Sequence, residues 1–128
     1  MSKQDEINIL VVDDEEIMRQ LFTDILQDEG YNVTTFQNGK ETQDRIKDTF
    51  FDIAFVDVHM PIMDGIKTLY LLRDITPKTA VVMMDSMPDY VFEEFKKEGA
   101  VTCIRKPFNI REVRTVVGEI IKKGEANG

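Results

Sequence analysis

The sequence has few of the features that would place a protein in a membrane, in an oxidising compartment or on nucleic acid. Cys103 is the only cysteine, so no intramolecular disulfide can form, and the chain fits a reducing compartment. Basic residues are scarce, because 16 Lys and Arg stand against 24 Asp and Glu and the formal net charge is −8. This deficit argues against direct binding to nucleic acid or to anionic membranes. No apolar run approaches the length of a membrane span, and the polar start MSKQDEIN lacks the apolar core of a signal peptide, so we expect a cytoplasmic protein.

The chain does contain enough apolar residues for one core. Its 128 residues are 42% hydrophobic, which suits a single domain and excludes a disordered composition. No internal repeat or low-complexity segment divides it. We expect the domain to cover residues 7–122, between a polar N-terminal tail at 1–6 and a frayed C-terminal tail at 123–128.

Five short apolar runs alternate with five helical patterns. The runs at 9–12, 53–56 and 80–84 are continuous, which is typical of parallel strands covered on both faces. The run at 33–36 is more polar and is expected near a sheet edge, and a short fifth strand is expected at 102–104. Helices are expected at about 17–29, 40–48, 66–74, 88–98 and 110–122, the first with an apolar face at 17, 18, 21, 22, 25 and 26. The pattern predicts an α/β fold: a doubly wound five-stranded parallel sheet with helices on both faces, of the flavodoxin-like (βα)5 type.

Charged side chains stand where three of these strands end. Asp13 and Asp14 follow the first strand, Asp57 follows the third, and Lys106 comes shortly after the fifth. Open parallel sheets place their ligand sites at the carboxyl ends of the strands. The four residues therefore predict a small acidic metal pocket with one fixed cation. Taken singly they have simpler interpretations: a helix N-cap with a first-turn acid, a turn residue, and a solvated lysine.

Three motifs carry a resemblance to a known family. They are VVDDEE, with Asp13 and Asp14; VDVHMPIMDG, with Asp57, Pro61 and Gly65; and RKPF, with Lys106 and Pro107. In this order, each at a strand end, they make the chain similar to the receiver domains of two-component response regulators, over about residues 7–122. Pro61, Gly65 and Pro107 match turn positions of that family.

The resemblance implies a phosphoacceptor signalling domain rather than an enzyme with an external substrate, its only chemistry being its own phosphorylation and dephosphorylation. Asp57 would receive a phosphoryl group from a histidine kinase or phosphotransfer protein, and Lys106 would contact the phosphoryl oxygens. The resemblance also implies a Mg²⁺ cofactor. Its ligands would be Asp14, Asp57, Asp13 through water, and the backbone carbonyl of His59, a set of hard oxygen donors suited to this ion.

The positions that receivers use for switching depart from the family pattern. Receivers carry Thr or Ser at the end of the fourth strand, and its hydroxyl binds the phosphoryl group and draws the next loop inward. Here Asp85 takes that position and Ser86 follows it. Either Asp85 faces the phosphorylation site or Ser86 supplies a hydroxyl from a changed loop; we favour Asp85, with atypical switching. Cys103 stands where many receivers have a switch aromatic, and His59 and Met87 are candidates for modulating the phosphoryl lifetime, although a plain loop side chain is the simpler interpretation of His59.

The output implied by the resemblance is a change in the surface of the fourth helix, fifth strand and fifth helix, where an effector would bind or a homodimer would form. Asp85 leaves an alternative open: a binding module of the same fold that signals without phosphorylation. A Mg²⁺-dependent phosphohydrolase with an aspartyl nucleophile is a third hypothesis, disfavoured because His59 stands where such enzymes carry a second acid. Flavin binding is weaker still, since no Gly-rich or Ser/Thr-rich phosphate loop follows the first strand.

Overall fold

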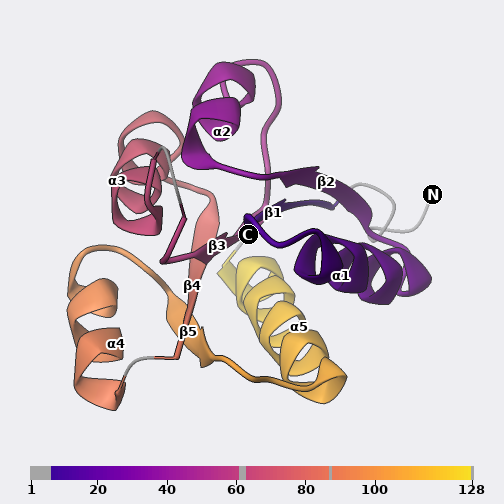
Figure 1. Ribbon diagram of the computed structural model, residues 1–128. Helices are drawn as coiled ribbons and strands as arrows, with labels where there is room; N and C mark the ends of the chain where they lie inside the picture. The colour runs from indigo at the N-terminus through magenta and orange to yellow at the C-terminus, as the bar shows by residue number, and fades with distance from the viewer. Residues whose placement is uncertain (1–6, 61–62, 87, 128) are drawn as a thin grey trace.

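Five parallel strands form one sheet in the order β2-β1-β3-β4-β5, with five helices packed on its two faces (Figure 1). This is the doubly wound α/β fold that the sequence predicts. The computed structural model describes residues 7–60, 63–86 and 88–127. The elements are β1 (Asn8–Val12), α1 (Glu16–Asp28), β2 (Asn32–Phe36), α2 (Gly39–Arg45), β3 (Ile53–Asp57), α3 (Gly65–Ile75), β4 (Ala80–Asp85), α4 (Asp89–Lys97), β5 (Thr102–Arg105) and α5 (Ile110–Asn127).

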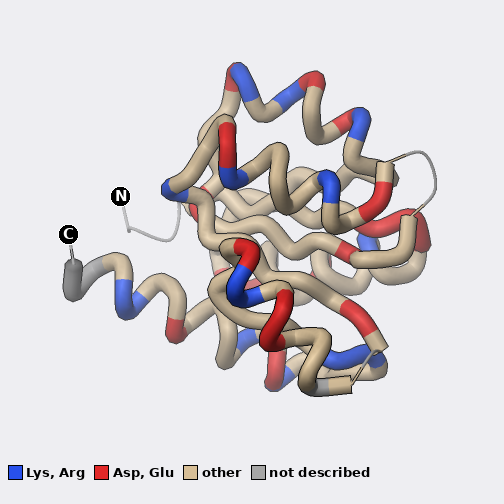
Figure 2. The backbone as a smooth tube through the Cα atoms, turned by 90° about the vertical axis from the view of Figure 1, so that its left-hand side faces the viewer, with Lys and Arg blue, Asp and Glu red and all other residues tan. Residues whose placement is uncertain are grey.

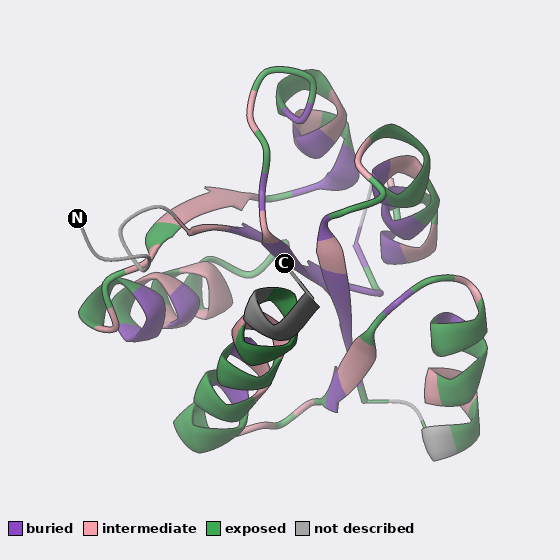
Figure 3. Cartoon of the chain, turned by 180° about the vertical axis from the view of Figure 1, so that it is seen from behind, coloured by how far each residue is buried: buried purple, intermediate pink, exposed green. Residues whose placement is uncertain are grey.

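The sheet carries a separate apolar core on each face, because alternate residues of a strand point to opposite sides. On one face Val56 of β3 packs in a cluster with Leu69 of α3, and α2, α3 and α4 lie on this side (Figure 1). On the other face Phe55 meets Phe22 of α1, with ring centroids 4.9 Å apart, and Val113 of α5 joins the same cluster. Strands β1, β3 and β4 are therefore almost wholly buried (Figure 3).

The predicted elements are present, and the largest differences from their expected ends are at α2 and α5. The strand expected at an edge, β2, is confirmed as one. Helix α2 ends at Arg45 rather than at 48, and the buried Ile46 is its C-cap. Helix α5 continues to Asn127 instead of fraying after Lys122, because the polar residues of that segment are compatible with a helix. Ile17, in the first turn of α1, is 81% exposed rather than part of the core.

Basic and acidic residues are interspersed along the helices (Figure 2). On α4, Lys96 lies 3.5 Å from Glu93 and Lys97 lies 3.4 Å from Glu94, each pair one helical turn apart. Such exposed ion pairs contribute little stability, but each places a carboxylate beside one of the few basic side chains. None of the helices in the described residues has the length and apolarity needed to cross a membrane.

Strand register brings the predicted site residues to one edge of the sheet. Val12 of β1 pairs with Val56 of β3, so Asp13 and Asp57 are the next residues on two neighbouring strands. The backbone N–H of Lys106 donates to the carbonyl of the last residue of β4 at 2.8 Å, which ties the end of β5 to the same edge. The site predicted from separate motifs is therefore assembled by the parallel pairing itself.

Candidate functional site

Asp13, Asp14 and Asp57 form a cluster of carboxylates at the carboxyl edge of the sheet. Each offers one oxygen, and these oxygens all lie within 4.8 Å of one another. Asp13 is fully buried and Asp57 is 4% exposed, whereas Asp14 faces solvent. Three hard oxygen donors, one of them open to water, fit a Mg²⁺ ion that keeps part of its hydration shell.

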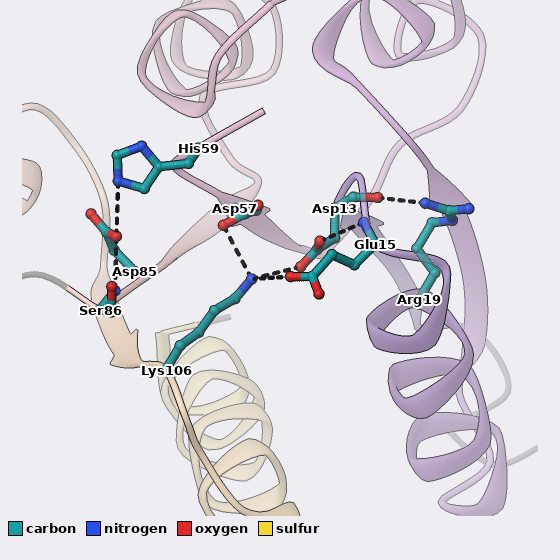
Figure 4. A network of polar contacts seen from close by, with 8 residues as sticks. All are labelled: Asp13, Glu15, Arg19, Asp57, His59, Asp85, Ser86 and Lys106. Atoms are coloured by element: carbon teal, nitrogen blue, oxygen red, sulfur yellow. Dashed lines mark hydrogen bonds and ion pairs between the residues drawn. The ribbon is translucent and has the colours of Figure 1, made fainter. Parts of the chain in front are cut away.

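Lys106 is the cation of this cluster. Its Nζ donates to Oδ2 of Asp13 at 3.0 Å and to Oδ1 of Asp57 at 3.2 Å, and it lies 3.8 Å from Oε1 of Glu15 (Figure 4). Burial alone would lower the pKa of Lys106, but the contacts with Asp13 and Asp57 outweigh it and raise this pKa. The ammonium group is therefore held in its charged form between the two buried carboxylates.

The positive charge near Asp57 is too small to offset burial and the neighbouring carboxylates. Burial, and next the negative charge of Asp13, raise its pKa from 3.8 to about 6, although Lys106 acts in the opposite direction. One lysine therefore does not balance three neighbouring acids. A bound cation would favour the ionised form of Asp57, which is the form that can act as a nucleophile.

Two further residues support the β1 side of the site and were missed in the sequence. Glu15 precedes α1, and its backbone N–H donates to Oδ1 of Asp13 at 3.0 Å. Arg19 donates from Nη1 to the backbone carbonyl of Asp13 at 2.8 Å (Figure 4). Neither Asp13 nor Asp14 is the N-cap of α1, because that position belongs to Glu15. The sequence signal for this role of Arg19 is its spacing, one turn into the helix.

The start of α3 lies close to the backbone of Asp57 and Val58. The N–H of Gly65 donates to the carbonyl of Val58 at 3.0 Å, and Asp64 caps α3 by accepting the N–H of Lys67 at 3.0 Å. A Cβ atom at Gly65 would collide with the backbone carbonyl of Asp57 and lie 2.7 Å from Cα of Val58. Gly65 is thus the residue that lets α3 start directly against the phosphoacceptor candidate.

Replacing Gly65 by alanine is expected to destabilise the protein by about 1–3 kcal/mol, because backbone atoms must move to admit the methyl group. Gly118 is a matched control, since it lies in α5 with nothing within 4 Å of an added Cβ. Gly118→Ala is expected to be neutral or to stabilise the protein by up to about 1 kcal/mol. Urea unfolding of both variants measures the difference, and equal stabilities would contradict the close packing at Gly65.

Asp85 remains in β4 as its last residue, with its side chain 2% exposed, while Ser86 faces solvent. Oδ1 of Asp85 accepts the N–H of Ser86 at 2.8 Å and lies 3.2 Å from Nε2 of His59 (Figure 4). Oδ2 is buried without a hydrogen-bond partner among the described residues. The structure therefore joins Asp85 to His59, a pairing that no sequence pattern predicts.

The remaining predicted residues lie around this edge or outside the described part. Cys103 on β5 is half-buried, its thiol donates to the carbonyl of Phe92 at 3.8 Å, and burial raises the pKa of the thiol to about 11. It therefore contacts α4 as a neutral group. Pro107 follows Lys106 through a cis peptide bond. Pro61 and Met87 lie outside the described residues.

Comparison with known proteins agrees with this geometry. Residues 9–118 match the family model of the response regulator receiver domain. The chain is 33% identical over 110 residues to sporulation initiation phosphotransferase F of Bacillus subtilis (strain 168), covering 85% of this chain and 89% of that protein. It is 34% identical over 116 residues to the transcriptional regulatory protein CpxR of Escherichia coli (strain K12), covering 90% of this chain and 49% of CpxR.

Solved structures give the same result. A response regulator receiver domain protein (CheY-like) from Methanospirillum hungatei JF-1 has a TM-score of 0.88 at 28% identity, covering 95% of this chain and 98% of that one. A chain of the CheX-CheY-BeF3-Mg complex from Borrelia burgdorferi has a TM-score of 0.85 at 28% identity, covering 90% of this chain and 89% of that one. The fold and the acidic strand-end cluster define a two-component signalling module. The chain belongs to the response regulator receiver domain family.

Membership in this family has general consequences. Receiver domains are signalling domains of two-component systems, and phosphorylation and Mg²⁺ binding at an acidic pocket are typical of them. Response regulators interact with histidine kinases or phosphotransfer proteins and with effectors.

Proposed function

We propose that this receiver takes a phosphoryl group onto Asp57 from the phosphohistidine of a kinase or phosphotransfer protein. The observation that carries the proposal is the position of Lys106, whose Nζ lies 3.0 Å from Asp13 and 3.2 Å from Asp57 beside three clustered carboxylates. A fixed cation next to a nucleophile and a site for a divalent ion are the parts that phosphoryl transfer requires.

Asp57 supplies the nucleophile. One oxygen of its carboxylate forms a bond to phosphorus while the phosphorus–nitrogen bond of the donor breaks, and the product is a mixed acyl phosphate. Lys106 stabilises charge on the phosphoryl oxygens, and Asp13 holds its ammonium group in place. A Mg²⁺ ion held by Asp13, Asp14, Asp57 and the backbone carbonyl of His59 offsets the same charge when bound.

The direct test is covalent labelling. Acetyl phosphate with Mg²⁺ is expected to add one phosphoryl group, seen as an intact-mass increase, and beryllofluoride is expected to give a bound fluorine NMR signal. Asp57→Asn should abolish both, because an amide is not a competent nucleophile. Asp44→Asn, exposed on α2 beside Lys40, is the matched control and should keep both. An adduct that survives Asp57→Asn would overturn the assignment.

We also propose that the output surface is formed by α4, β5 and α5, where an effector or a second copy of the chain would bind. Two large apolar side chains at the starts of α4 and α5 support this, because they are exposed in the single chain. They are Tyr90 at 71% and Ile110 at 44%. A partner bound at this surface would cover them.

A second candidate function is a binding module that signals without phosphorylation. The observation favouring it is Asp85, a buried carboxylate at the position where a hydroxyl would contact the phosphoryl group. Partner binding that is unchanged by Asp57→Ala and by beryllofluoride would favour this alternative. Binding that requires the adduct would favour the phosphoacceptor function.

A further inference from the structure

Among the described residues, His59 provides the only hydrogen bond or ion pair that joins the Asp85 side chain to another part of the fold. The other partner of its Oδ1 is the N–H of Ser86, the next residue, at 2.8 Å, so that bond moves with Asp85 itself. Its Oδ2 has no hydrogen-bond partner in the described residues. A buried carboxylate with so few donors is poorly solvated. The 3.2 Å contact with Nε2 of His59 is therefore what ties this carboxylate to the rest of the site.

His59 reaches Asp85 across the edge where a phosphoryl group would sit. It lies two residues after Asp57, on the segment that leaves β3, and its side chain is 71% exposed. Asp85 ends the neighbouring strand, one residue beyond Met84, which pairs with Asp57. The imidazole thus crosses from the end of β3 to the end of β4 (Figure 4). A phosphoryl group on Asp57 would extend into the same region.

Asp85 cannot replace the hydroxyl contact of other receivers. An ionised carboxylate only accepts hydrogen bonds, and so does a phosphoryl group. Two anions on adjacent strand ends also repel each other, more strongly where water is excluded. Lys106 contacts Asp13, Asp57 and Glu15, and it makes no ion pair with Asp85 among the described residues, so it offsets charge on the Asp57 side and not at Asp85. The imidazole of His59 can donate a hydrogen bond: its Nε2 lies 3.2 Å from Oδ1 of Asp85, and the residue stands two positions after Asp57.

We propose that His59 exchanges partners, from Asp85 to the phosphoryl group on Asp57, and that Asp85 then leaves its buried position at the end of β4. This inference rests on the proposed phosphoacceptor function. It makes His59 the positioning residue that supplies the contact a hydroxyl supplies elsewhere. It also reverses the response, because the end of β4 moves outward instead of being drawn toward the phosphoryl group.

The first arm of the test needs no phosphodonor. In the full chain, His59→Ala is expected to speed hydrogen exchange of the Ser86 amide at least about fivefold, the equivalent of one lost hydrogen bond. His59→Gln keeps an N–H donor and should restore most of the protection. His59 is exposed, so neither variant should unfold, and circular dichroism checks this. Unchanged Ser86 exchange in His59→Ala would overturn the inference.

The second arm adds beryllofluoride and Mg²⁺. In the unmodified chain the adduct is expected to shift the imidazole nitrogen resonances of His59 and the carboxyl carbon resonance of Asp85, and to speed Ser86 exchange. Asp85→Thr restores a hydroxyl donor, so the same adduct should slow Ser86 exchange in that variant. An adduct without these changes, or the same direction of change in both proteins, would overturn this inference alone. Absence of any adduct would overturn the proposed function, and the inference with it.

Discussion

A Lys106→Met variant is expected to take up phosphoryl groups from acetyl phosphate at least about 100-fold more slowly than the unmodified chain, the usual cost of removing one preorganised partner of the reacting oxygens. The ammonium group lies 3.0 Å from Asp13 and 3.2 Å from Asp57, and its side chain is 20% exposed. Methionine keeps most of the apolar stem of lysine but supplies no charge. The substitution should therefore slow phosphoryl transfer while leaving the packing of the side chain nearly unchanged.

Two further variants separate charge from geometry. Lys106→Arg keeps the charge but replaces a compact ammonium with a planar fork, so an intermediate rate is expected. Lys97→Met removes an exposed lysine that pairs only with Glu94 at 3.4 Å and should leave the rate unchanged. The rates come from intact mass over time at fixed acetyl phosphate and Mg²⁺. A Lys106→Met rate close to that of Lys97→Met would show that Lys106 does not act on the phosphoryl group.

An Asp57→Asn variant is expected to be more stable than the unmodified chain at pH 7 without Mg²⁺, by up to about 3 kcal/mol. The reason is the raised pKa of Asp57, about 6 instead of 3.8, which burial and the charge of Asp13 produce. A rise of this size costs the ionised side chain about 3 kcal/mol in the folded state. Loss of the 3.2 Å contact with Lys106 reduces the gain.

The pH dependence of this effect has a definite sign. Below the unfolded pKa of 3.8, Asp57 is protonated in both states and carries no penalty. As pH rises toward the folded pKa of about 6, the unfolded chain loses its proton first, so the free energy of unfolding falls. Above that range the penalty is complete. The advantage of Asp57→Asn should thus be small at pH 4 and full at pH 7.

Urea unfolding with a chelator at both pH values measures this difference. Asp44→Asn is the control, because Asp44 is 61% exposed beside Lys40 and should show no comparable gain. Added Mg²⁺ should stabilise the unmodified chain more than Asp57→Asn, since the variant lacks one ligand carboxylate. An Asp57→Asn variant that is less stable than the unmodified chain at pH 7 would contradict the interpretation that ionised Asp57 destabilises the folded protein.

The four residues of the acid–lysine cluster were predictable because each lies at the carboxyl end of a strand or just beyond it. Parallel strands end at a common edge, so Asp13, Asp14, Asp57 and Lys106 had to meet once the strands were recognised. Helix ends were less predictable. The continuation of α5 past Lys122 runs through Lys, Glu and Ala, which favour a helix, and through Gly124, which does not, and such a mixed segment does not mark a boundary.

Contacts made by side chains across loops were not predictable. Arg19 reaches the carbonyl of Asp13, and His59 reaches Asp85, through loop paths and rotamers that no periodicity encodes. Ile17 shows the same limit for burial, because its spacing places it on the apolar face of α1 while its position at the sheet edge leaves it 81% exposed.

By itself, the sequence determined the strand–helix alternation, the parallel sheet and the identity of the acid cluster, because hydrophobic period and strand-end chemistry are local properties. Only the tertiary structure decided how that cluster is connected. It placed Lys106 between Asp13 and Asp57, and it turned Asp85 toward His59. These contacts depend on which side chains lie within reach of the same donor. That set of neighbours exists only after the chain has folded.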